Sequence, residues 1–146
     1  MRQGRITWAE LGNILGLSAP AAAERVRQLE SHGVIKQFAA LVDPASLGHG
    51  LAAFIAVSLE RPQHRAAFLQ RVQELPEVQE CHHVAGDDDY WLKVRCLNTQ
   101  HLDWLLTDQL KSIPGVIRTR TTIVLSTPKE TSAVPLPQTS EYNGEI

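Results

Sequence analysis

The residues with the clearest chemical potential lie at Gly86–Tyr90, a short stretch that contains three consecutive aspartates. Adjacent carboxylates repel one another unless a cation or hydrogen-bond donors satisfy them. The stretch could therefore bind a ligand ammonium group, or it could be a structural turn neutralised by Arg118 and Arg120. Calcium is less favoured, because the three acids lack the spacing of a loop that wraps the ion.

A second set of functional candidates lies where a helix is predicted to begin, at Ser18. A DNA-recognition helix presents its N-terminal turns to base edges and its positive charges to phosphates. Ser18 could contact a base or a phosphate, and alanine methyl groups could contact thymine methyl groups. Arg25 and Arg27 suit phosphates, unless they pair with Glu24 or Glu30 on the helix surface. The candidate DNA-binding residues are Ser18, Ala19, Pro20, Ala21, Arg25 and Arg27.

The Cys81-His82-His83 run suggests a zinc site, but its geometry argues against one. In a strand Cys81 and His83 share a face while His82 points away. Even when the other Cys and His residues of the chain are added, the spacing does not match the four ligands of a compact zinc site. We expect no metal and no cofactor. The sequence also shows no nucleophile paired with a base and no Gly-rich phosphate loop, so we expect no catalytic residues. A metal-dependent enzyme is the remote alternative.

Composition limits the class of protein. The chain has 146 residues, 43% of them hydrophobic, and a net charge of −2, which fits one domain or two very small ones. Residues 1–38 hold five basic and three acidic residues, whereas the remainder holds nine and thirteen. A nucleic-acid surface is therefore expected at the N-terminal end. Two cysteines and no long apolar run indicate a cytoplasmic protein that does not enter a membrane.

The N-terminal part is predicted to form two helices joined by a glycine corner. Thr7 can cap a helix over Trp8–Leu15, and Gly16 can end that helix in the left-handed conformation. A second helix is expected from Ser18 to Gly33, with an apolar stripe on one side. Two helices with a short glycine corner form the helix-turn-helix pattern.

The C-terminal part alternates strands and helices in the order βαββαβ. Expected strands cover 51–60, 77–84, 90–97 and 115–126, and expected helices begin at Pro62 and cover 100–111. This order predicts a ferredoxin-like sandwich, with two helices on one face of a four-stranded antiparallel sheet. The apolar residues of the other face predict dimerisation. We expect an α+β chain of three parts: a helix-turn-helix domain with a linker strand at 1–47, a βαββαβ domain at 48–128, and a flexible tail at 129–146.

Three stretches of the chain resemble the Lrp/AsnC family of bacterial and archaeal transcription regulators. They are WAELGNILGLSAPAAAERVRQLESHGVI, ECHHVAGDDDYWLKVR and IPGVIRTRTTIVLST. The resemblance covers nearly the whole chain, and the Gly-Asp-x-Asp-Tyr turn is its most specific mark. It implies a helix-turn-helix domain joined to an effector-binding domain. It also implies dimers that pair through their sheets, often assemble into octamers, and bind amino acids or related molecules between dimers.

In one respect the chain differs from that family. Members usually begin with another helix ahead of the Gly-Arg-Ile stretch seen here at residues 4–6. That helix is missing here, so either the start is misassigned or truncated, or DNA binding is weakened. An alternative function is therefore a small-molecule-binding oligomer that has lost DNA binding.

The resemblance gives the acidic turn a specific role as part of an effector site. Asp89, and less surely Asp87, would bind the ammonium group of an amino acid, and backbone N–H groups of the turn would bind its carboxylate. The end of the last strand could line the same interface pocket. The candidate effector-binding residues are His83, Gly86, Asp87, Asp89, Tyr90, Thr122 and Ile123. The sequence predicts a transcriptional regulator that binds double-stranded DNA and responds to a small amino-acid-like effector.

Overall fold

The protein is described here by a computed structural model that covers residues 5–134 of the chain. The chain divides into two compact units, one containing the described residues up to Leu41 and the other spanning Val42–Lys129. Most of the tail predicted to be flexible, residues 135–146, lies outside the described residues. Among those described, no helix is both long enough and apolar enough to cross a membrane.

The first unit is a pair of helices, α1 (Trp8–Leu15) and α2 (Ala19–Ser31). A capping box begins α1, since the Thr7 hydroxyl accepts from the Glu10 N–H at 3.2 Å and the Glu10 carboxylate accepts from the Thr7 N–H at 2.8 Å. The Thr7 N–H and the Thr7 hydroxyl both donate to the Glu10 carboxylate, and these two bonds lower the pKa of Glu10. Gly16 ends the helix with a φ of 66°, as predicted.

Close approach of the backbone at Gly12 sets the corner between α1 and α2. A methyl group added at Gly12 would lie 2.6 Å from the carbonyl oxygen of Leu17. Ala22 and Val26 of α2 are buried, whereas Ile14 of α1 is 71% exposed. The two helices therefore bury a narrow stripe and leave part of their apolar surface open.

The segment between the helices and the sheet is extended but forms no strand. Residues 34–43 pair with no strand in the described part of the chain, so the linker strand, which needs a partner strand, stays a prediction. Asp43 then begins a turn: its carboxylate accepts from the Ser46 hydroxyl at 2.6 Å and from the Ala45 and Ser46 N–H groups at 3.2 and 3.1 Å. These bonds lower the pKa of Asp43. A short 3-10 helix, η1 (Ala45–Leu47), follows.

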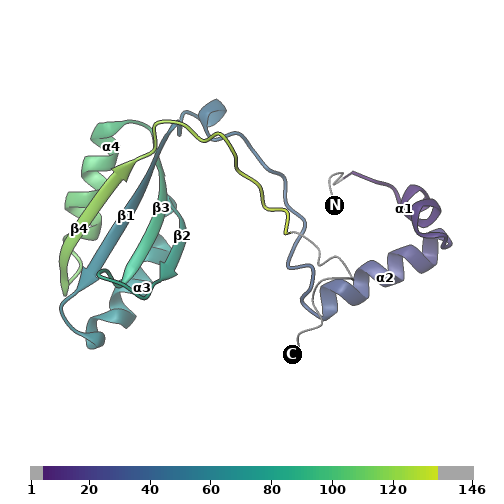
Figure 1. Ribbon diagram of the computed structural model, residues 1–146, viewed down its shortest axis with the longest axis horizontal. Helices are drawn as coiled ribbons and strands as arrows, with labels where there is room; N and C mark the ends of the chain where they lie inside the picture. The colour runs from purple at the N-terminus through teal and green to yellow at the C-terminus, as the bar shows by residue number, and fades with distance from the viewer. Residues whose placement is uncertain (1–4, 135–146) are drawn as a thin grey trace. The chain divides into compact units, whose positions relative to one another are not determined.

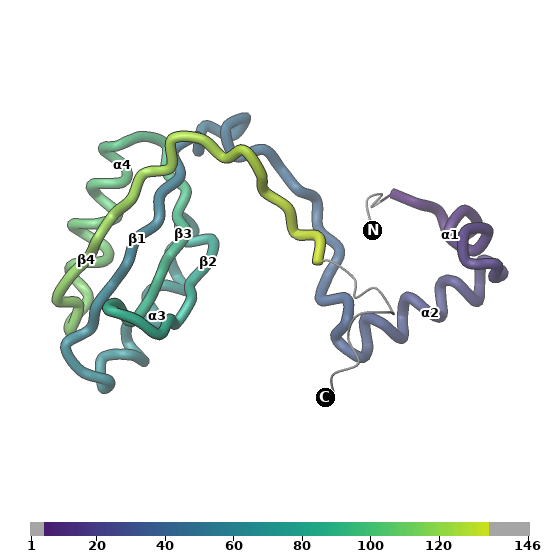
Figure 2. Tube along the Cα trace, in the orientation of Figure 1, coloured from purple at the N-terminus to yellow at the C-terminus, as the bar shows by residue number. Residues whose placement is uncertain are grey.

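The second unit confirms the predicted βαββαβ order. Its four strands form one antiparallel sheet in the order β2-β3-β1-β4, with the helices covering one face (Figure 1). In Figure 2 the trace of β1 runs between β3 and β4. The strands are β1 (Leu51–Leu59), β2 (Val78–His83), β3 (Tyr90–Cys96) and β4 (Val116–Ile123).

The helices depart from the prediction in two details. Pro62 begins a 3-10 turn, η2 (Pro62–His64), and the α-helix α3 (Arg65–Glu74) starts after it. The helix predicted at 100–111 starts as α4 (Thr99–Trp104) and continues as a π-helical segment, η3 (Leu105–Leu110). Asn98 caps α4, because its side chain accepts from the His101 N–H at 2.9 Å.

The core lies between the helices and one face of the sheet. Every second residue of β3 from Tyr90 to Cys96 is buried there, as the period of a strand requires. The largest fully buried side chains are Phe68, Ile55, Leu92, Leu105, Leu110, Val57, Val94 and Cys96. On the open face Phe54 and Trp91 are 41% and 48% exposed. They border a hollow of about 280 Å³ that Arg120 and Thr122 also line.

Candidate DNA-binding helix and effector site

The N-terminal turn of α2 presents little besides small side chains. Ser18 caps the helix, since its hydroxyl accepts from the Ala21 N–H at 3.3 Å. Pro20 and Ala21 are exposed, while Ala19 is half-buried. The hydroxyl of Ser18 thus has a structural role, and this turn can contact DNA through methyl and methylene groups.

The two arginines of α2 differ in their surroundings. The Arg27 guanidinium pairs with the Glu24 carboxylate at 2.9 Å, one of the pairings considered from the sequence. Both side chains are exposed, so the pair contributes little to stability. Arg25 is exposed and makes no ion pair within residues 5–134. Both guanidinium groups thus lie on the exposed surface of α2.

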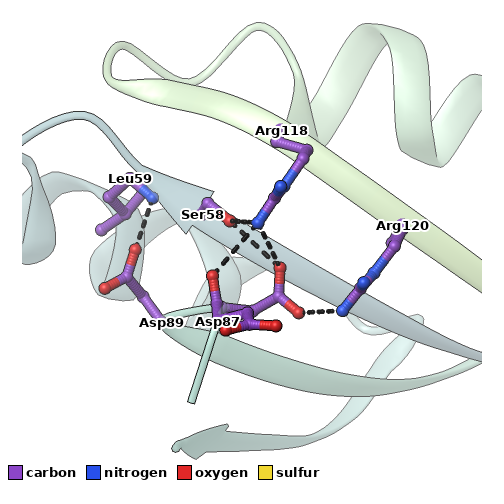
Figure 3. Close-up of polar contacts among 7 residues, drawn as sticks. Ser58, Leu59, Asp87, Asp89, Arg118 and Arg120 are labelled. Carbon is purple, nitrogen blue, oxygen red and sulfur yellow. Dashed lines mark hydrogen bonds and ion pairs between the residues drawn. The ribbon is translucent and has the colours of Figure 1, made fainter. Parts of the chain in front are cut away.

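The acidic turn is fixed to the sheet by Asp88, a residue that the sequence reasoning left out of the site. Its side chain is 3% exposed and accepts from the Ser58 hydroxyl at 3.1 Å. Arg118 lies 3.3 Å from one carboxylate oxygen, and Arg120 bonds the other (Figure 3). Arg118 also donates to the backbone carbonyl of Asp87 at 3.1 Å. The sequence did contain a signal for this role of Asp88. Arg118 and Arg120 were candidates to neutralise the turn, and a structural ion pair requires one of its three aspartates as the partner.

Asp89 lies against β1, away from the two arginines (Figure 3). Its Oδ2 atom accepts from the Leu59 N–H at 2.7 Å. Its backbone N–H donates to the Val57 carbonyl at 3.0 Å. The Asp89 N–H is therefore not free to bind a ligand carboxylate, and the expectation that N–H groups of the turn do so stays a prediction for the other residues of the turn.

A cavity of about 290 Å³ opens beside Asp89 on the side of the turn that meets β1. His83 and Tyr90, two other predicted site residues, also line it, and their rings stack with centroids 5.1 Å apart. The hydroxyl oxygen of Tyr90 is buried and has no hydrogen-bond partner among the described residues. The structure thus brings together three of the predicted effector-binding residues, whereas Gly86 and Asp87 do not line the cavity.

Thr122 and Ile123 lie elsewhere. Tyr90 is opposite Val57 of β1, and Thr119 of β4 is opposite the same residue. Thr122 is three residues further along β4 and lines the hollow on the open face. Within one chain, Thr122 and Ile123 therefore do not share a pocket with the acidic turn. A strand's register with its neighbours is not visible in its own sequence.

The opposite wall of the cavity was missed from the sequence. It is formed by the end of β1 and the loop that leads into α3, and the lining residues there are Leu59, Glu60, Arg61, Pro62 and Arg65. Two charged residues directly after an apolar strand, Glu60 and Arg61, were the available signal. The loop is distant in sequence from the turn between β2 and β3. The fold places the two side by side, because β3 pairs with β1.

The two cysteines are packed inside the second unit, with Cys96 buried and Cys81 half-buried. Burial raises the pKa of the Cys96 thiol to about 11, with the Glu77 carboxylate as a smaller cause. His101 lies 3.1 Å from Glu77. No three His, Cys, Asp or Glu residues within 5–134 are grouped in a way that could hold a metal ion.

Comparison with known proteins assigns the family. The AsnC-type helix-turn-helix domain matches residues 1–30, and the Lrp/AsnC ligand binding domain matches residues 52–134. The chain belongs to the Lrp/AsnC family. It is an Lrp/AsnC-type transcriptional regulator with a DNA-binding helix-turn-helix domain and a ligand-binding domain, and this is a family of regulators rather than of enzymes.

Relatives of this Lrp/AsnC regulator cover most of its length. The leucine-responsive regulatory protein of Escherichia coli strain K12 is 40% identical over 133 residues, 90% of this chain and 81% of that protein. The HTH-type transcriptional regulator FL11 of Pyrococcus horikoshii is 38% identical over 133 residues, 91% and 87% of the two chains. A transcriptional regulator from Neisseria meningitidis, solved in complex with L-methionine, has a TM-score of 0.86 and 34% identity and covers 90% of this chain and 86% of its own.

Proposed function

We propose that this Lrp/AsnC regulator binds double-stranded DNA mainly through phosphate contacts from α2. The N-terminal turn of α2 offers few groups that can read bases, whereas Arg25 and Arg27 are exposed. Phosphate contacts position a protein on DNA without reading the base sequence. The shape and bendability of the DNA therefore supply much of the preference for one binding site over another. The residues proposed to contact DNA are Ser18, Ala19, Pro20, Ala21, Arg25 and Arg27.

The regulator's activity or assembly responds to an amino acid bound beside the acidic turn. The observation that carries this proposal is the cavity that joins Asp89, His83 and Tyr90 to the charged loop after β1. Two similar proteins, from Neisseria meningitidis and Mycobacterium tuberculosis, were solved with L-methionine. Gly86 and Asp87 of the same turn, and Thr122 and Ile123 supplied by another subunit, complete the proposed effector-binding set.

The regulator acts in the cytoplasm, without catalysis, as a homodimer that assembles further, by resemblance into octamers. The open sheet face supports the dimer, because the exposed Phe54 and Trp91 side chains lie at its centre. A ligand between dimers would favour one assembly over another and so change how the helix-turn-helix domains are presented to DNA. The domain limits proposed from the sequence, 1–47 and 48–128, fit this division of roles.

One experiment tests both halves of this function. Duplex DNA from upstream of the regulator's own gene is titrated with the full chain, with and without each of the twenty amino acids, and binding is followed by fluorescence anisotropy. We expect binding that weakens steeply with salt and changes with at least one amino acid. Absence of binding at low salt would overturn the DNA-binding role. Binding unchanged by all twenty amino acids, together with no shift in melting temperature, would overturn the effector role.

A further inference from the structure

The first hydrogen-bonding side chain within α2 is the carboxylate of Glu24. The five helix residues before it are four alanines and a proline, and the Ser18 hydroxyl already caps the helix. Recognition helices read base edges from their N-terminal turns, so a polar group this early in α2 is placed to meet a base. The inference that follows rests on the proposed DNA-binding function and adds to it a residue that selects bases.

Glu24 lies on the side of α2 opposite its buried stripe. Ala22 and Val26 are the buried residues of the helix. Pro20, Glu24 and Arg27 follow one another at steps of four and three residues, which places them on one side of a helix, and all three are exposed. The surface that α2 can present to a DNA groove therefore carries a negative charge between Pro20 and Arg27.

Arg27 holds one oxygen of this carboxylate and leaves the other open. Its Nε and Nη2 atoms donate to Glu24 Oε2 at 3.1 and 2.9 Å. The Oε1 atom of Glu24 accepts no hydrogen bond from any group within residues 5–134, and the side chain is 56% exposed. A guanidinium group has five N–H donors, so Arg27 can bind a phosphate with those that Glu24 does not use.

A carboxylate on this surface weakens DNA binding unless it accepts a hydrogen bond. It is repelled by the phosphates and by the acceptor atoms that line the major groove, which are O6 and N7 of guanine, N7 of adenine and O4 of thymine. Cytosine N4 and adenine N6 are the amino groups that present N–H donors there. Cytosine is the better partner, because adenine N6 lies beside N7, which would repel the second carboxylate oxygen.

We infer that Glu24 selects a cytosine in the DNA site by accepting a hydrogen bond from the N4 amino group in the major groove. The same charge acts against guanine and thymine, whose hydrogen-bonding groups on that edge are acceptors. Loss of one charge-assisted hydrogen bond corresponds to about tenfold in affinity. Phosphate contacts still position the protein, and Glu24 adds a preference at one base pair.

The test begins with selection of binding sites by the full chain from a duplex library that has a random central segment. We expect the selected sites to share a C·G pair at one position. Four duplexes that differ only at that pair are then titrated with the protein by fluorescence anisotropy. The unmodified chain should bind the cytosine duplex about tenfold more tightly than the guanine and thymine duplexes, with the adenine duplex between them.

Two substitutions of Glu24 should change this preference in different ways. Glu24→Ala should bind the four duplexes nearly equally, and it should bind the guanine and thymine duplexes more tightly than the unmodified chain does, because the repelling charge is gone. Glu24→Gln should change the preference to adenine, because a carboxamide bonds adenine N6 and N7 together. Both changes lie at an exposed helix position, so the fold is kept.

Glu30→Gln is the matched control, because it removes the same charge from an exposed position in the last turn of α2. It should keep the preference for cytosine. The inference alone fails if the selected sites share no C·G pair, or if Glu24→Ala raises the affinity for all four duplexes by the same factor. The second result would show that Glu24 only repels phosphates. It also fails if Glu30→Gln removes the preference. If the unmodified chain binds no duplex at low salt, the DNA-binding role itself fails.

Discussion

The carboxylate of Asp88 and the guanidinium of Arg120 join the acidic turn to the outer strand β4. Asp88 is almost fully buried, whereas Arg120 is largely exposed and also lines the hollow on the open sheet face. Asp89, the next residue, faces the cavity on the other side of the turn. One short segment therefore contacts both the proposed effector site and the sheet face proposed to form the dimer.

Asp88→Asn should destabilise the βαββαβ unit by about 1–2 kcal/mol. The variant can keep the hydrogen bond from Ser58 but loses the negative charge that pairs with Arg118 and Arg120. Because both arginines are exposed, solvent weakens these ion pairs, and their loss costs less than that of a fully buried pair. Urea unfolding followed by tryptophan fluorescence measures the change. Asp87→Asn is the control, because that side chain is exposed, and it should change stability by less than about 0.5 kcal/mol. Equal effects of the two variants would show that the Asp88 ion pairs contribute nothing.

Gly12→Ala should disrupt the helix-turn-helix by about 1–3 kcal/mol, because the new methyl group would meet the Leu17 carbonyl at 2.6 Å. DNA affinity should fall and amide exchange in α1 and α2 should accelerate, while exchange in the sheet stays unchanged. Gly50→Ala is the control, since a methyl group there meets nothing within 4 Å. Unchanged protection in α1 would contradict the close contact.

Arg25→Ala and Arg27→Ala should each weaken binding to all DNA sequences alike. If each arginine binds one phosphate, each variant lowers the slope of log affinity against log salt by about 0.9. The pair of Arg27 with Glu24 is exposed, so exchanging that partner for a phosphate costs little. Anisotropy titrations at several salt concentrations, on two unrelated duplexes, measure both quantities. A loss confined to one base pair's preference would assign the arginine to base readout instead.

Stability should fall in alkali because of Cys96. Its pKa is about 11 in the folded protein, against about 9 for the ordinary value. Below pH 9 the thiol is protonated in both states and its contribution is complete; as the pH rises towards 11 the unfolded chain ionises first, and the contribution is lost. The free energy of unfolding should drop by about 2 kcal/mol between pH 8 and pH 10.5 from this group. Cys96→Val should lack this part of the drop, and an identical pH profile in the variant would contradict the assignment.

The sequence was enough to predict the elements of the fold, because each carries a local signal. Thr7, Gly16 and Ser18 lie at helix ends where capping requires them, and the spacing of apolar residues distinguishes the helices from the strands. The family followed from motifs that span nearly the whole chain. The linker strand has no such local signal, since a strand requires a partner, and residues 34–43 have none among the described residues.

The site was only partly predictable, because it depends on contacts between distant segments. Asp89 and Tyr90 could be selected from the turn itself. Arg65 could not, since its approach to the turn follows from the sheet order, which places β3 next to β1. The three aspartates also look equivalent in the sequence. Their different roles appear only when β1 passes beneath the turn, with Asp88 on one side and Asp89 on the other.

The arginines of β4 have a further consequence for how the protein avoids aggregation. This strand pairs with β1 along one edge and with no other strand in the described part of the chain. Its sequence is rich in β-branched residues, which makes a free edge prone to pairing with other chains. Arg118 and Arg120 add two positive charges to this strand, of which the shared Asp88 carboxylate neutralises one, and like charges oppose stacking of identical strands. We therefore expect the residues that hold the acidic turn in place also to discourage pairing of β4 with the same strand of another chain.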